Sequence, residues 1–127
     1  MISPEKIRKF SRILLVFYFA VVLALCFLNP GDLPELGPTL FGIEIDKVVH
    51  FLMFMPLPSL FFLSFEGKPS AIIGASVLAG IALAGTTEWI QGFLSYRSMD
   101  LVDFYADLLG LLSGAALTGI IVAIKKK

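Results

Sequence analysis

Four apolar segments dominate this chain of 127 residues, and each is close to the length of helix that crosses a bilayer. They lie at about residues 11–28, 48–65, 70–89 and 104–124. Roughly 20 apolar residues in a helix span about 30 Å of hydrocarbon. Backbone amides in lipid must be satisfied internally, and four spans are too few to close a barrel. The sequence therefore predicts an all-α membrane protein, a four-transmembrane-helix bundle forming a single domain over residues 1–127.

Composition supports a membrane location. Hydrophobic residues make up 57% of the chain and the mean hydropathy is +0.90, far above the value for a water-soluble surface. Ten basic and ten acidic residues give a formal net charge of zero. No basic face for nucleic acid is indicated, so the lipid bilayer is the expected partner. The sequence does not decide whether the protein forms homo-oligomers.

The distribution of basic residues predicts the orientation. Eight of the ten fall on the side of the termini, against two opposite. The eight are Lys6, Arg8, Lys9, Arg12, Lys68, Lys125, Lys126 and Lys127, and the two are Lys47 and Arg97. Short cytoplasmic segments carry such an excess. We therefore expect both termini to be cytoplasmic.

The connections between spans differ. Pro56 and Pro58 remove two amide donors from the second span, which predicts a kink there. Residues 66–69 form a tight turn that makes the second and third spans antiparallel. The longer outer connection, residues 29–46, shows no periodic pattern and is expected to lack regular structure.

Polar residues gather where the spans begin or end on the outer side. Burying a charge at the bilayer centre costs about 2.5 to 3.5 kcal/mol, so such residues are rare unless they are used. We expect them to converge on one outer-facing pocket and take them as candidates for ligand binding. They are Asp46, Lys47, His50, Glu88, Gln91, Arg97, Asp100, Asp103 and Asp107. The alternative is a set of interfacial charges, with His50 bonded to Asp46 as a local pair.

Small residues line one face of each of the last two spans. Gly110 and Gly114 form a G-x-x-x-G pair in the fourth span, and Gly80 and Ala84 recur at the same spacing in the third. Such faces let two helices approach closely. We predict that the third and fourth spans pack through these four residues.

No metal or other cofactor is predicted from spacing. One histidine and several carboxylates suit a divalent ion, but the familiar spacings of zinc and di-iron sites are missing. The single cysteine, Cys26, excludes an intrachain disulfide and a cysteine-based metal site.

The order of these residues resembles the VanZ-like family of small bacterial membrane proteins. The resemblance rests on Asp46-Lys47-x-x-His50-Phe51, Glu88-x-x-Gln91, then Arg97, Asp100 and Asp103, and the helix with Gly110 and Gly114. It covers about the last two thirds of the chain. Asp107 departs from it, standing where the family usually has Asn. The resemblance implies a multi-pass protein of the bacterial cytoplasmic membrane. The family's namesake is associated with resistance to the glycopeptide teicoplanin, but the family's biochemical activity is not established.

Two functions remain open from the sequence. The first is a non-enzymatic cell-envelope protein whose outer-facing polar pocket binds a lipid-linked precursor or a lipoglycopeptide. The second is a membrane-embedded enzyme that acts on an envelope lipid head group with carboxylate and histidine acid–base chemistry. A transporter is the weaker expectation, because four short spans leave little room for alternating access.

Overall fold

The computed structural model describes residues 2–27, 39–40, 42–94 and 101–126. Its helices are α1 (Pro4–Phe27), α2 (Ile45–Phe54), α3 (Leu57–Ser64), α4 (Pro69–Gln91) and α5 (Leu101–Lys125). Within this described part, four helical segments are long and apolar enough to cross a membrane by length and composition, with α2 and α3 together forming the second. All four begin before the predicted apolar runs. Polar residues at the amino ends of α1, α2 and α5 continue those helices, and α4 begins one residue earlier, at Pro69.

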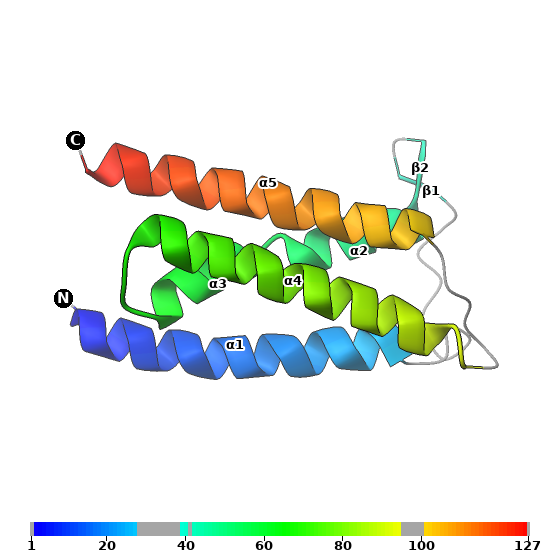
Figure 1. Cartoon of the computed structure of the whole chain (residues 1–127), viewed down its shortest axis with the longest axis horizontal. Helices are drawn as coiled ribbons and strands as arrows, with labels where there is room; N and C mark the ends of the chain where they lie inside the picture. The colour runs from blue at the N-terminus through cyan, green and yellow to red at the C-terminus, as the bar shows by residue number, and fades with distance from the viewer. Residues whose placement is uncertain (1, 28–38, 41, 95–100, 127) are drawn as a thin grey trace.

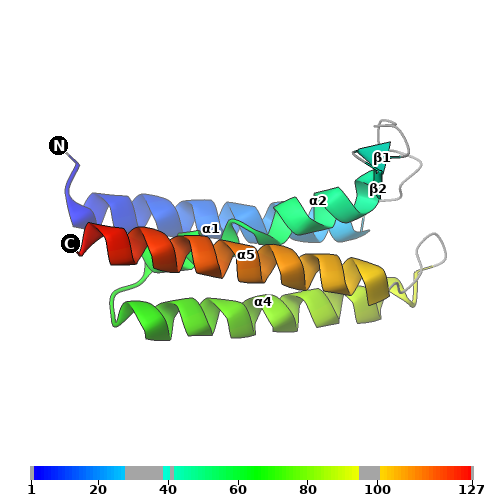
Figure 2. The same ribbon diagram turned by 90° about the horizontal axis from the view of Figure 1, so that it is seen from above.

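The helices run side by side along the long axis of the molecule (Figures 1 and 2). Both termini lie at one end, as an even number of spans requires, and the short strands lie at the other end. The antiparallel neighbours α3 and α4 are joined by a tight turn around Gly67, whose φ of 148° favours glycine.

The second segment is interrupted where its two prolines lie. A turn at Met55 and Pro56 separates α2 from α3, and α3 starts with proline at its first turn. Proline suits this position because it has no amide hydrogen to leave unsatisfied. The Tyr18 hydroxyl of α1 donates a hydrogen bond to the Met53 carbonyl, in the last turn of α2, at 2.6 Å. The helix is thus divided at the predicted place, while the kink itself stays a prediction.

The expectation that residues 29–46 lack regular structure is wrong for the described part of this connection, which forms a short hairpin. Strands β1 (Thr39–Leu40) and β2 (Ile43–Glu44) pair antiparallel, with Thr39 opposite Glu44. Gly42 lies between them with a φ of 80°, a conformation that glycine adopts without steric cost. This hairpin leads directly into α2.

Glycines decide how closely α5 approaches its neighbours. A Cβ on Gly110 would overlap the Phe51 carbonyl of α2, and one on Gly114 would overlap the Met55 carbonyl. The prediction that this pair packs against the third span is wrong, because its nearest neighbours belong to the second. Gly80 of α4 does face α5, where a Cβ would strike Leu111. The buried Ala84 lies in the core with Leu111, Phe54 and Val22.

Candidate functional site

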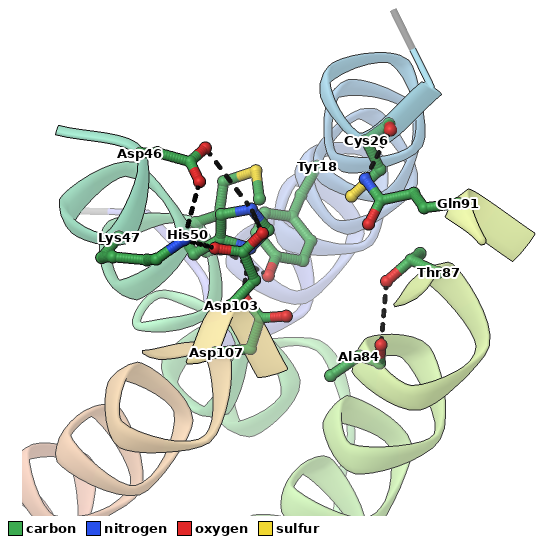
Figure 3. Close-up of polar contacts among 11 residues, drawn as sticks. Tyr18, Cys26, Asp46, Lys47, His50, Ala84, Thr87, Gln91, Asp103 and Asp107 are labelled. Atoms are coloured by element: carbon green, nitrogen blue, oxygen red, sulfur yellow. Dashed lines mark hydrogen bonds and ion pairs between the residues drawn. The ribbon is translucent and has the colours of Figure 1, made fainter. Parts of the chain in front are cut away.

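A polar cluster forms where the beginnings of α2 and α5 lie against each other (Figure 3). It consists of Asp46, Lys47, His50, Asp103 and Asp107. Asp46 and His50 are four residues apart on α2, as are Asp103 and Asp107 on α5, so each pair shares a helical face. The close approach at Gly110 turns these two faces toward each other.

Lys47 holds two carboxylates of the cluster. Its Nζ lies 2.5 Å from Asp103 Oδ1 and 3.1 Å from Asp46 Oδ2. The side chains of Lys47 and Asp103 are only 15% and 11% exposed, whereas that of Asp46 is 54% exposed. Charge-assisted bonds of this kind are stronger than neutral ones. Because Asp46 has the most exposed side chain of the cluster, a ligand from outside reaches it first.

His50 is bonded to the opposite helix. Its Nδ1 donates to Asp107 Oδ1 at 2.7 Å, and both side chains are buried. Its Nε2 faces Asp103 Oδ2 at 3.6 Å and Asp46 Oδ1 at 3.9 Å. The local pair with Asp46, offered as the simple alternative, is too long for a hydrogen bond. The tertiary contact with Asp107 therefore dominates.

The remaining candidates divide into three cases. Glu88 of α4 is buried, and its carboxylate, His50 and Asp107 each offer a ligand atom within 4.8 Å of the others. Gln91 does not join this group, because its Nε2 donates to the Cys26 carbonyl near the end of α1 at 2.6 Å. Gln91 thus ties α4 to α1. Arg97 and Asp100 lie outside the described residues.

An apolar groove adjoins the cluster. This groove was not predicted from the sequence. It has a volume of about 540 Å³ and runs between α2 and α5. Its walls include Phe51 and Leu52 from α2 and Tyr105 and Leu109 from α5, and Lys47 also lines it. Leu52, Tyr105 and Leu109 are more than half exposed, so the groove opens to the outside of the bundle. The sequence signal for the groove was the four-residue spacing of Tyr105 and Leu109, which places both side chains on one face of a helix.

About half of the chain is similar to a known protein. A segment of 66 residues is 36% identical to an uncharacterized protein of Schizosaccharomyces pombe, covering 51% of this chain. The matched region corresponds to 41% of that protein, so this chain spans less than half of its relative's length. No family model and no solved structure matches the chain. The comparisons therefore assign neither a family nor an activity.

Proposed function

We propose that this chain is a VanZ-like membrane protein that binds a lipid-linked envelope molecule. Its polar cluster would receive the head group, and the groove between α2 and α5 the hydrocarbon chain. One observation carries the proposal: Lys47 belongs both to the cluster and to the groove. An amphipathic ligand needs such a junction, because its charged and apolar parts are covalently joined. A volume of about 540 Å³ is in the range of small-molecule sites.

The charges of the cluster favour a head group with both signs. Lys47 suits a phosphate or carboxylate, while Asp46 and Asp103 suit an amine or sugar hydroxyls. Since Lys47 is already bonded to both aspartates, an incoming phosphate would exchange for one of them. The half-exposed Asp46 is the easier to displace. The same reasoning applies to a lipoglycopeptide, which combines an acyl chain with polar groups.

The proposed orientation places both termini in the cytoplasm and the cluster on the outer side. Its support is the excess of basic residues at the end of the molecule that carries the termini (Figure 1). A reporter fused to the C-terminus should therefore read cytoplasmic. The bacterial cytoplasmic membrane and a role in glycopeptide resistance come from the VanZ resemblance only, and lipid binding requires neither.

Lipid retention tests the proposal. The purified protein would be incubated with phosphatidylcholine vesicles containing a polyprenyl phosphate, then re-isolated and its bound lipid quantified by mass spectrometry. Leu109→Trp fills the groove and Lys47→Met removes its charge, so each should lower retention of the polyprenyl phosphate about tenfold, or roughly 1.4 kcal/mol. Leu112→Trp is the control, because Leu112 is 54% exposed on the same helix and does not line the groove. Equal retention by all three variants would refute a lipid site here.

The second candidate function, an enzyme acting on a lipid head group, is favoured by the His50–Asp107 pair. A buried carboxylate 2.7 Å from Nδ1 orients the imidazole and leaves Nε2 directed at the other side chains of the cluster. This is the arrangement in which histidine works as a general acid or base. Incubation with radiolabelled polyprenyl phosphate separates the two functions. Release of the label by the parent protein, abolished in His50→Gln, indicates an enzyme, while retention without release indicates a binding protein.

A further inference from the structure

Three buried metal-ligating side chains meet between α2, α4 and α5. His50, Glu88 and Asp107 are 4%, 4% and 0% exposed. Each offers a ligand atom, and these atoms lie within 4.8 Å of one another. The residues are far apart in the sequence, and only the packing of three helices brings them together. Imidazole nitrogen and carboxylate oxygen are ligands of catalytic and structural Zn²⁺.

The Asp107 carboxylate in this group is only half satisfied. Asp107 Oδ1 accepts from His50, but Oδ2 is buried and makes no hydrogen bond within the described part of the chain. Figure 3 shows the Asp107 carboxylate between the side chains of α2 and helix α4, with its second oxygen on the side of α4. A buried carboxylate oxygen without a partner carries a large desolvation cost. A bound cation would remove that cost.

The surroundings of His50 suit coordination through Nδ1. A metal ion would replace the hydrogen between Nδ1 and Asp107, leaving the hydrogen on Nε2. Nε2 faces Asp103 Oδ2 at 3.6 Å and Asp46 Oδ1 at 3.9 Å. The other oxygens of these two aspartates are held by Lys47. Both distances exceed a hydrogen bond, but the two carboxylates favour a hydrogen on Nε2, and outer carboxylates of this kind raise the affinity of a histidine ligand for its metal.

We propose that His50, Glu88 and Asp107 bind one divalent transition-metal cation of the Zn²⁺ or Mn²⁺ type. Two carboxylates and a neutral imidazole balance a charge of +2, which favours the ion in a site of low dielectric constant. A second grouping, Asp46, His50 and Asp103, also has three donors, but Asp46 is exposed and Asp107 Oδ2 would stay unsatisfied. The buried grouping is therefore the better site. Its occupancy does not depend on lipid binding.

Titration of the full chain tests the site. The protein, purified in detergent without a histidine tag and stripped with a chelator, would be titrated with Zn²⁺, Mn²⁺ and Mg²⁺ by calorimetry. We expect one Zn²⁺ or Mn²⁺ per chain and at least tenfold weaker binding of Mg²⁺, since imidazole favours the transition metals. Glu88→Gln and Asp107→Asn should each weaken Zn²⁺ binding tenfold or more. Glu66→Gln, at the opposite end of the bundle, is the matched control and should bind like the parent.

Two further measurements keep the test decisive. Thermal unfolding of each metal-free variant shows whether it is folded, and a ¹⁴N coupling in the electron-spin-echo spectrum of bound Mn²⁺, lost in His50→Gln, identifies the imidazole ligand in the parent fold. No stoichiometric binding, or no ¹⁴N coupling, would overturn the proposal. Weaker binding in Asp46→Asn with unchanged binding in Glu88→Gln would overturn this site in favour of the second grouping.

Discussion

The two ends of the bundle carry the same kinds of charged residue in different surroundings. At the end with the termini, Arg8 pairs with Glu66 and Lys9 lies 3.5 Å from Glu5, and three of these four side chains are more than 70% exposed. At the other end, the Lys47–Asp103 side chains are at most 15% exposed. Ion pairs in water contribute little because solvent screens them. Removing one partner of a buried pair is strongly destabilising, because it leaves the other charge out of water.

Among the described residues, this contrast shows why the candidate site forms at one end of the bundle and not at the other. The exposed pairs can be lost without leaving a charge out of water. In the polar cluster, Lys47 and His50 of α2 each pair with an aspartate of α5, so the cluster can hold a defined geometry. A ligand or ion that replaces one partner there meets groups already oriented toward it.

The largest expected difference follows from removing one basic residue at each end. Lys47→Met leaves Asp46 and Asp103 without their shared cation and should lower the free energy of unfolding by roughly 3 kcal/mol. Arg8→Met breaks the pair with the exposed Glu66 and should cost below about 1 kcal/mol. Unfolding in mixed detergent micelles measures both values. Similar losses at both ends would mean that burial does not distinguish the two sets of charges.

A smaller effect is expected from the helix contact that brings the cluster together. Gly110→Ala places a methyl group against the Phe51 carbonyl and should destabilise the fold by about 1–3 kcal/mol, because α2 and α5 must separate. Gly119→Ala is the matched control on the same helix, since nothing lies within 4 Å of its Cβ position. It should be neutral or stabilise by up to about 1 kcal/mol. Thermal unfolding of both variants checks this, and equal behaviour would contradict the proposed contact.

The smallest effect concerns an uncharged hydrogen bond that is located between the two ends of the bundle. Tyr18→Phe removes the donor to the Met53 carbonyl at the break between α2 and α3, and should cost about 0.5–1.5 kcal/mol. Tyr105→Phe is the control, because Tyr105 is 60% exposed on α5 and should tolerate the change. Unfolding of the two variants under identical conditions gives the difference. A loss as large as that for Lys47→Met would mean that charge is not what makes the polar cluster sensitive.

The sequence by itself determined the helical segments and the level at which their polar residues lie. Long apolar runs require helices in lipid, since their amides find partners locally. The four-residue spacings of Asp46 with His50 and Asp103 with Asp107 also placed each pair on one face correctly. These features depend on contacts between neighbours in the chain, and a local pattern is enough to predict them.

Only the tertiary structure decided which faces meet. Gly110 packs on α2 and Gly114 on the turn and helix α3 that follow it. His50 bonds Asp107 in preference to Asp46, and Gln91 turns toward α1. The groove and the grouping of His50, Glu88 and Asp107 follow from the same packing. Such contacts join residues of different helices. Their choice depends on the rotation of each helix about its axis, which the shapes of all the facing side chains set together.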